Sequence, residues 1–240
     1  NPDGTFTPNA QHDLSKSSGA KGAYGFRCSI SADGKTALVA GHHYDNSSGG
    51  AWIWQYDPET KVWGKYNPDG TFTPNAQHDV SKPSGANGYY GMCCSISADG
   101  QTALVSGYAS TSGGGAYIWQ YDPETKVWGK YNPDGTFTPN AQHDVSKPSG
   151  ANGYYGMCCS ISADGQTALV SGSSTSTSGG AYIWQYDTNS QTWGKYVIGG
   201  TFEQDVPHDI SKTSGTNGNY GVSCSISADG QTALVAGYTG

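Results

Sequence analysis

A histidine followed by an aspartate recurs along the chain and is the pattern most suggestive of chemistry. The histidines are spaced 66, 65 and 65 residues apart, and a Ser-Lys pair follows each one: His12, His78, His143 and His208. His, Asp and Ser build nucleophile–base triads, but a triad needs side chains that converge from separate elements. Here the His, Asp and Ser residues are close neighbours in the sequence, so we expect a structural role instead. The aspartates should accept backbone N–H groups in Asx turns. The alternative is a ring of histidines that binds a metal. We predict no catalytic residue, no cofactor and no metal.

Cysteines follow the same period. Four are equivalent, and two extra ones precede them by one residue: Cys28, Cys94, Cys159 and Cys224, with Cys93 and Cys158 as the extras. Adjacent strand residues point to opposite faces. This alternation suggests bridges between successive repeats, namely Cys28–Cys93, Cys94–Cys158 and Cys159–Cys224. Disulfides predict an oxidising, extracellular setting. The alternative is six free thiols in a cytosolic protein. A sequon at Asn46 predicts glycosylation of a loop.

Two sets of aromatic residues recur once per repeat. One set alternates along a strand, which favours a place in the core: Trp54, Trp119 and Trp184, with Tyr56, Tyr121 and Tyr186. The second set lies nearer a turn and an expected sheet edge: Trp63, Trp128 and Trp193, with Tyr66, Tyr131 and Tyr196. Aromatic faces pack against sugar rings, so the second set is the candidate glycan-stacking site.

The positions of all these residues follow from an internal repeat. The stretch "YGMCCSISADGQTALVSG" at 90–107 returns unchanged at 155–172, and weaker copies begin at 24 and 220. A fixed period of this length marks an array of supersecondary units that bury their apolar faces against one another. We therefore divide the chain into a connector, three repeats and a partial fourth repeat: 1–23, 24–89, 90–154, 155–219 and 220–240.

One repeat reads as four short antiparallel strands. They are expected at 92–98, 102–108, 116–122 and 126–131, with a tight turn at Asp99-Gly100 and a further edge strand at 136–138. Tyr117 and Trp119 should face one side of the third strand, and Ala116 and Ile118 the other. Four-stranded units repeated radially are propeller blades, whereas solenoid coils are shorter. The predicted fold class is all-β, a β-propeller-like array of four ~65-residue four-stranded repeats, the last incomplete.

The order of these elements resembles a known repeat. Tyr90-Gly91, the Ser-Ala-Asp-Gly turn, "TALVSG", a Gly-rich loop and "GAYIW" are similar to the FG-GAP repeat of integrin-α-type β-propellers. The resemblance implies a propeller, and FG-GAP-like propellers include lectins. Two departures stand out, because the Gly-Ala-Pro element and the Asp-rich calcium loop are both missing. Calcium takes six to eight oxygen ligands, so one carboxylate per turn predicts no structural calcium.

The two expected strand pairs do not occur the same number of times. The aromatic strand pair appears at 51–66, 116–131 and 181–196, whereas the pair around "CSISADG" appears four times. An unfinished sheet leaves unpaired N–H and C=O groups. Three explanations stand open. The sequence is truncated, the first connector completes the last repeat, or another copy of the chain supplies the missing strands.

Composition and charge narrow the function. Charged residues make up 13% of the chain, the net charge is −7, and the twelve basic residues are dispersed, which excludes a nucleic-acid partner. The sequence contains no run of 18 apolar residues, which is about the length that a membrane-spanning helix needs. We expect a non-enzymatic, secreted structural or adhesive protein that assembles head-to-tail with copies of itself. The alternative is a carbohydrate-binding propeller, a lectin with one glycan site per repeat.

Overall fold

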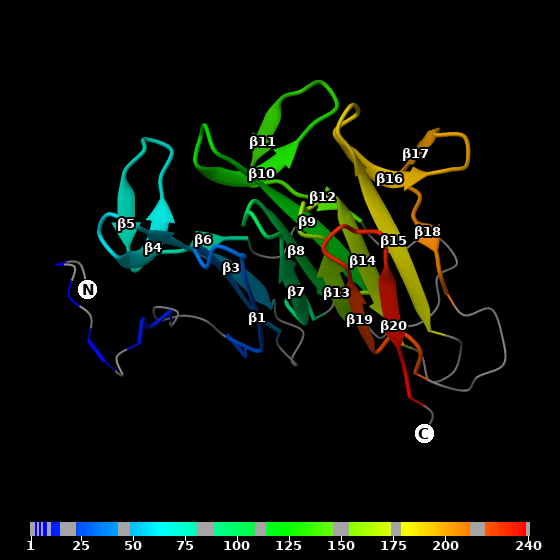
Figure 1. The fold of residues 1–240 in the computed structure, drawn as a ribbon, viewed down its shortest axis with the longest axis horizontal. Helices are drawn as coiled ribbons and strands as arrows, with labels where there is room; N and C mark the ends of the chain where they lie inside the picture. Colours follow the sequence, from blue (N-terminus) through cyan, green and yellow to red (C-terminus); the bar gives the residue numbers. More distant parts are fainter. Residues whose placement is uncertain are drawn as a thin grey trace.

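The computed structural model is all-β, and its described residues contain strands, turns and bends without a helix. The residues that the structure describes are 3, 5, 7, 8, 11–14, 23–42, 49–80, 89–108, 114–145, 154–173, 179–211 and 219–238. The strands form four successive modules that follow one another across the molecule in chain order (Figure 1). This arrangement confirms the predicted all-β, propeller-like array.

Among the described residues, each of the first three modules contributes six strands, and the fourth contributes two. The first module contains β1 (Arg27–Ile30), β2 (Thr36–Gly41), β3 (Gly50–Asp57), β4 (Val62–Tyr66), β5 (Phe72–Pro74) and β6 (His78–Asp79). The second contains β7 (Cys93–Ile96), β8 (Thr102–Gly107), β9 (Gly115–Asp122), β10 (Val127–Tyr131), β11 (Phe137–Pro139) and β12 (His143–Asp144). The third contains β13 (Cys158–Ile161), β14 (Thr167–Gly172), β15 (Gly180–Asp187), β16 (Thr192–Tyr196), β17 (Phe202–Gln204) and β18 (His208–Asp209). The fourth contains β19 (Ser223–Ile226) and β20 (Ala233–Ala236).

Sheet topology is the same in the three six-stranded modules. Five strands pair antiparallel in chain order, and the sixth, of two residues, returns to the third. In the second module β10 covers only the end of β9, from Gln120 to Asp122, so β12 pairs with Ile118 and Tyr117 next to it. The expected four strands and the edge strand are therefore present, and the His-Asp pair adds a strand that sequence analysis missed.

The turn between the first two strands of each module is held by its own side chains. In the second module the N–H of Gly100 donates to the carbonyl of Ser97 at 3.0 Å. The carboxylate of Asp99 accepts from the Ser97 hydroxyl at 2.5 Å and from the N–H of Gln101 at 2.9 Å. Only the glycine takes a positive φ, of 70°. The turn is therefore a β-turn followed by a left-handed glycine, which suits Gly without steric cost.

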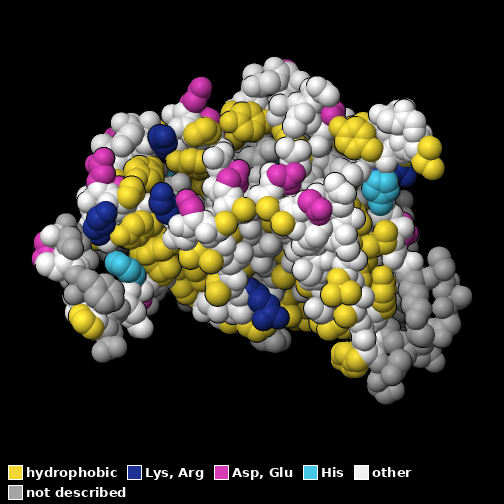
Figure 2. Space-filling model, viewed as in Figure 1, with side chains coloured by type: hydrophobic (Ala, Val, Ile, Leu, Met, Phe, Trp, Pro, Cys, Tyr) yellow, Lys and Arg dark blue, Asp and Glu magenta, His cyan; other side chains and the backbone are white. Residues whose placement is uncertain are grey.

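Neighbouring modules join through their first strands and these turns. The N–H of Ala32 donates to the carbonyl of Ala98, and the pattern repeats from Ala98 to Ala163 and from Ala163 to Ala228, each at 2.9 Å. Because these bonds have the same length and join equivalent positions, each module packs on the next one in the same way. Figure 2 shows acidic side chains in a row across the middle of the face presented there.

The core lies between modules, where an aliphatic face meets an aromatic face. At the first junction Leu38 and Ile53 share a buried cluster with Tyr117 and Trp119 of the second module. At the second junction the opposite face of the second module packs against the third, through Leu104, Ala116, Ile118, Tyr182, Trp184 and Trp193. The predicted alternation of faces along 116–122 is confirmed. Each module thus depends on its neighbours to bury its sheet, as expected of a repeat protein.

The described part of the first connector lies on the first module. The hydroxyl of Tyr24 donates to the carbonyl of Leu14 at 2.7 Å, and the rings of His12 and Tyr56 are 6.1 Å apart, edge to face. His143 of the second module packs on Tyr186 of the third in the same way, at 6.0 Å. Residues 11–14 therefore occupy the place of a preceding module, and they do not complete the fourth. The repeat boundaries set by the sequence stay predictions.

Candidate functional site

The candidate site is a cavity between the second and third modules. The hairpins β4–β5, β10–β11 and β16–β17 lie along one rim of the molecule (Figure 1), and the cavity, of about 250 Å³, opens between the last two. The second module lines it with Lys130, Tyr131, Asn132, Pro133, His143 and Asp144. The third module lines it with Gln191, Thr192, Trp193, Gln204 and Asp205. The site is thus assembled from two repeats and belongs to neither alone.

The tautomer of His143 is fixed by its partner. Its Nε2 lies 2.8 Å from Oε1 of Gln120, and that same oxygen accepts the backbone N–H of Tyr131 at 3.2 Å. A backbone N–H is only a donor, so the shared atom is the amide oxygen and Nε2 carries the ring proton. The lone pair of the imidazole therefore lies on Nδ1, which is the atom able to accept a proton or a hydrogen bond.

The imidazole is neutral over the physiological range. Burial, followed by the positive charge of Lys130, lowers the pKa of His143 to about 4. The equivalent His78 also has a pKa lowered to about 4, by burial and then by Lys65. Burial disfavours the charged form of a histidine, and a nearby cation acts in the same direction. Above pH 5 the lone pair on Nδ1 is therefore available.

Trp193 supplies a buried hydrogen-bond donor beside the cavity. Its side chain is 3% exposed, and its ring packs on Tyr186 with the ring centroids 5.3 Å apart. Within the described part of the chain its indole N–H has no hydrogen-bond partner, and the same holds for Trp128 at the first junction. Buried polar groups are nearly always paired, so an unpaired donor next to a cavity calls for an acceptor.

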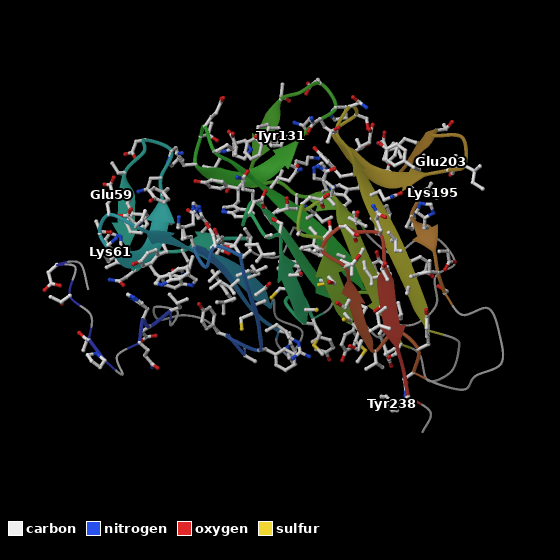
Figure 3. The ribbon with its side chains drawn as sticks, in the orientation of Figure 1. Glu59, Lys61, Tyr131, Lys195, Glu203 and Tyr238 are labelled. Atoms are coloured by element: carbon white, nitrogen blue, oxygen red, sulfur yellow. The ribbon has the colours of Figure 1, made fainter. Side chains whose placement is uncertain are left out.

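Lys130 brings a cation without an ion pair among the described residues. Its counterpart in the third module, Lys195, is paired with Glu203 at 3.1 Å (Figure 3). The side chain across the hairpin from Lys130 is Thr138, which is neutral. On the other side of the cavity, Asp205 accepts a hydrogen bond from the amide of Gln204 at 3.1 Å. The cavity therefore combines a cation, carboxylates, amides and a neutral imidazole.

The first junction has the same frame but different lining residues. His78 bonds to Gln55 at 2.8 Å as His143 bonds to Gln120. Of the third-module positions that line the cavity, only Trp193 is repeated, as Trp128. The second module carries Lys126, Val127, Pro139 and Asn140 in place of the others. Compared with the first junction, the second has the acidic Asp205 in place of Asn140 and the neutral Gln191 in place of Lys126. This difference in charge makes the second junction the candidate site.

The predicted glycan-stacking residues are mostly used for packing. Trp128 and Trp193 are each 3% exposed, because the neighbouring module covers them, and Trp63 is half-buried. The tyrosines pack edge-on or tilted against a phenylalanine of their own hairpin: Tyr66, Tyr131 and Tyr196. Their hydroxyls donate to Asp57, Asp122 and Asp187. Hydrogen bonds from Ser190 and then Tyr196 lower the pKa of Asp187 to about 2. The expectation of exposed stacking faces is therefore wrong for the buried tryptophans.

The structure reverses the faces assumed for the cysteines. All six are free thiols. Cys94 lies in the core of the first junction and Cys93 in that of the second, whereas the pairs Cys28–Cys93 and Cys94–Cys158 require the opposite. Cys159 faces the second module and not the fourth, so Cys159–Cys224 is not brought together either. The predicted glycosylation site, Asn46, lies outside the described residues.

The histidines do not form a metal-binding ring. His12 lies in the first connector and the other three lie in separate modules. The described residues contain no group of three or more His, Cys, Asp or Glu side chains placed to hold a metal. The expected Asx turn is confirmed at Asp209, whose carboxylate accepts the N–H of Ser211 at 2.8 Å. No helix among the described residues is long and apolar enough to cross a membrane.

Of the cavity-lining residues of the third module, only Trp193 was a candidate from the sequence, as a glycan-stacking residue. The sequence signal that could have found the others is a difference between repeats. The third repeat departs from the second at "TNSQT" (188–192), at "VIG" (197–199) and at "EQDVP" (203–207). Four of these residues line the cavity, namely Gln191, Thr192, Gln204 and Asp205.

No protein-family model and no curated protein sequence matches the chain. Several solved structures resemble it, including the following three. A periplasmic gluconolactonase from Pseudomonas aeruginosa is 16% identical over 88% of this chain and 64% of its own, with a TM-score of 0.38. A putative 6-phosphogluconolactonase from Bacteroides uniformis is 13% identical over 91% and 79%, with a TM-score of 0.31. TolB from Acinetobacter baumannii is 18% identical over 75% and 44%, with a TM-score of 0.25.

These comparisons correct several predictions. The first two structures are named as lactonases, which are enzymes, so the predictions of a non-enzymatic protein, of a self-assembling structural or adhesive protein and of a lectin are wrong. No family model supports membership of the FG-GAP repeats, and the propeller-like class alone stands. At TM-scores of 0.25 to 0.38 the likeness transfers no activity or substrate to this chain.

Proposed function

We propose that the chain is an enzyme that hydrolyses an ester bond of a small polyhydroxylated substrate, such as a cyclic sugar-acid ester, in the cavity of the second junction. The observation that carries the proposal is the set of groups lining this cavity: the neutral imidazole of His143, the ammonium of Lys130 and the unpartnered indole N–H of Trp193. Ester hydrolysis needs a proton acceptor for water and donors for the developing oxyanion.

Each group then has one role. Nδ1 of His143 accepts a proton from a water molecule, whose oxygen attacks the ester carbonyl carbon. The N–H of Trp193 and the ammonium of Lys130 donate to the carbonyl oxygen as it becomes negative. The protonated imidazole returns the proton to the leaving alkoxide oxygen. A base with a pKa of about 4 is weak, so the mechanism suits a strained cyclic ester better than an unstrained one.

The substrate class follows from the lining and the size of the cavity. A volume of about 250 Å³ suits a single ring rather than a polymer. The amides of Gln191 and Gln204 and the carboxylate of Asp205 offer donors and acceptors for several hydroxyl groups. Glucono-δ-lactone is a practical first compound to assay, because two of the similar structures are named for this kind of reaction.

Turnover by matched variants tests the proposal. The wild-type chain, Lys130→Ala and Lys65→Ala are compared on a panel of lactones, with spontaneous hydrolysis subtracted. Lys65 is the equivalent lysine at the first junction and serves as the control. We expect kcat/KM to fall at least about tenfold in Lys130→Ala, the scale of one charged hydrogen bond, and to stay within about twofold of wild type in Lys65→Ala. Equal losses, or a wild type that turns over no compound in the panel, contradict the proposal.

We also propose that the protein works outside the cytoplasm, as its sequence suggested through its cysteines. The Pseudomonas protein is named as periplasmic, and that name describes the neighbour. Fractionation of the cells that produce the chain tests the location, and recovery in the cytosol alone contradicts it.

A further inference from the structure

Two cysteines from different modules meet at the junction of the third and fourth modules. Sγ of Cys224 lies 2.8 Å from Sγ of Cys158. The N–H of Cys224 also donates to Sγ of Cys158 at 3.1 Å. Two residues further on, the N–H of Ile226 donates to the hydroxyl of Ser160 at 3.2 Å, so β13 and β19 run side by side in a fixed register. The register brings the two sulfurs together, and no rearrangement of the strands is needed.

The contact depends on a cysteine that occurs in two modules only. Cys158 and Cys93 hold the same position, whereas the first module has Arg27 there and the fourth has Ser223. Cys93 makes the same backbone contacts with Cys159, at 3.2 and 3.5 Å. At the last junction the sulfurs are the more accessible ones: Cys158 and Cys224 are partly exposed, whereas Cys93 and Cys159 are buried.

We propose that Cys158 and Cys224 form a disulfide bond that ties the two-stranded fourth module to the third. A disulfide has an S–S distance of about 2.05 Å, so the sulfurs need to approach by less than an ångström from their present contact. The proposal names a pair that differs from all three pairs suggested by the sequence, and it is independent of the proposed hydrolysis.

The reaction is thiol–disulfide exchange with a small external disulfide such as oxidised glutathione. The thiolate of Cys224 attacks one sulfur of that disulfide, forms a mixed disulfide and releases one thiolate. The thiolate of Cys158 then attacks the Cys224 sulfur and releases the second. Two protein thiols are oxidised, one external disulfide is reduced to two thiols, and the two protons pass to the solvent or to the released thiolates. Hydrogen bonds with Cys224 and then Cys93, followed by burial, raise the pKa of Cys158, which disfavours its thiolate before the mixed disulfide forms.

Counting thiols after oxidation tests the pair. The full chain is incubated with oxidised glutathione at pH 8, unfolded without reductant, alkylated and weighed. The six free thiols should fall to four alkylated sites in the wild type. Cys159→Ser, the matched control next to Cys158, should also lose two thiols. Cys158→Ser and Cys224→Ser should lose none, and tandem mass spectrometry of the wild type should locate the linked residues.

Three results would overturn the proposal. The wild type keeps six alkylated sites. Alternatively, Cys158→Ser still loses two thiols while Cys159→Ser loses none, which assigns the bond to Cys159. In the third case Cys93→Ser abolishes the loss and Cys224→Ser does not, which assigns the bond to Cys93 and Cys158. Should Cys158→Ser fail to fold, Cys224→Ser and the linked wild-type peptide decide the question, because both refer to the same bond.

Discussion

At the scale of single residues, one arrangement of His, Gln and Tyr is used at successive junctions and one of its copies has gained new neighbours. His78 and His143 hold the same bonds to Gln55 and Gln120. Because the His-Asp motif repeats, a structural role was the favoured prediction. The hydrogen bond of each ring Nε2 to a glutamine supports that role. The other ring nitrogen of His143 is where the second junction differs, because the facing residues of the third module have changed.

The half-buried His78 and His143 predict a loss of stability in mild acid. Their pKa values are lowered from 6.5 to about 4 in the folded chain, so between these values the unfolded chain binds more protons and the free energy of unfolding falls as pH falls. The loss should approach about 3 kcal/mol per histidine on going from pH 7 to pH 4.

Urea unfolding at several pH values between 7 and 4 measures this loss. Replacing both histidines with glutamine should make the stability depend less on pH in the upper part of that window, between pH 7 and pH 5. A wild-type stability that stays constant down to pH 4 would show that the histidines titrate normally.

At the scale of elements, the glycine of the first turn lies close to the preceding module in the second, third and fourth modules. A Cβ added to Gly100 would lie 2.5 Å from Oγ1 of Thr36, and one added to Gly34 would meet nothing within 4 Å. Both glycines have a φ of +70°. The two positions therefore share the same backbone conformation and differ only in the neighbouring module.

This pair separates backbone strain from junction packing. Gly34→Ala should cost about 1 kcal/mol, through strain alone. Gly100→Ala should cost about 1–3 kcal/mol more, because Thr36 has to move away from the new methyl group. Urea midpoints of the two variants measure the difference, and equal costs would mean that the turn does not pack on the preceding module.

The strands were predictable from sequence because their signals are local. "TALVSG" and "GAYIWQYD" are bounded by turn residues, and the structure places β8 and β9 within a residue of the expected limits. The two-residue strand at His143 was not predictable, because its length carries no periodicity and its partner is 25 residues away, at Ile118. The cavity was missed for a related reason, since Lys130 and Asp205 meet only when two modules stack.

At the scale of the whole molecule, the array is stabilised by its junctions and its last module is the weakest part. A two-stranded sheet is marginal by itself in water. Within its described residues the fourth module contains the pair β19 and β20, and Leu234 on β20 is 68% exposed, whereas the equivalent Leu169 is fully buried. The contact of this module with the third is therefore the place where a covalent bond has most effect.

The oxidised chain should be more stable than the reduced chain. A bond between Cys158 and Cys224 closes a loop across a sequence separation of 66 residues. Loop-closure entropy for that length predicts a gain of about 4 kcal/mol in the free energy of unfolding, diminished by any strain. Urea unfolding of the two forms measures the gain. Coincident curves, with the bond verified by mass, would contradict the account of the last module.

The most direct test of the central claim, that the second junction binds the substrate, is to follow the indole N–H signals by nuclear magnetic resonance during titration with the hydrolysis product. The chain has seven tryptophans, and Trp128 is the built-in control for Trp193 because both indole N–H groups are buried without a partner. We predict that the Trp193 signal moves with saturation and that the Trp128 signal does not. Movement of Trp128 alone, or of neither, would contradict the claim.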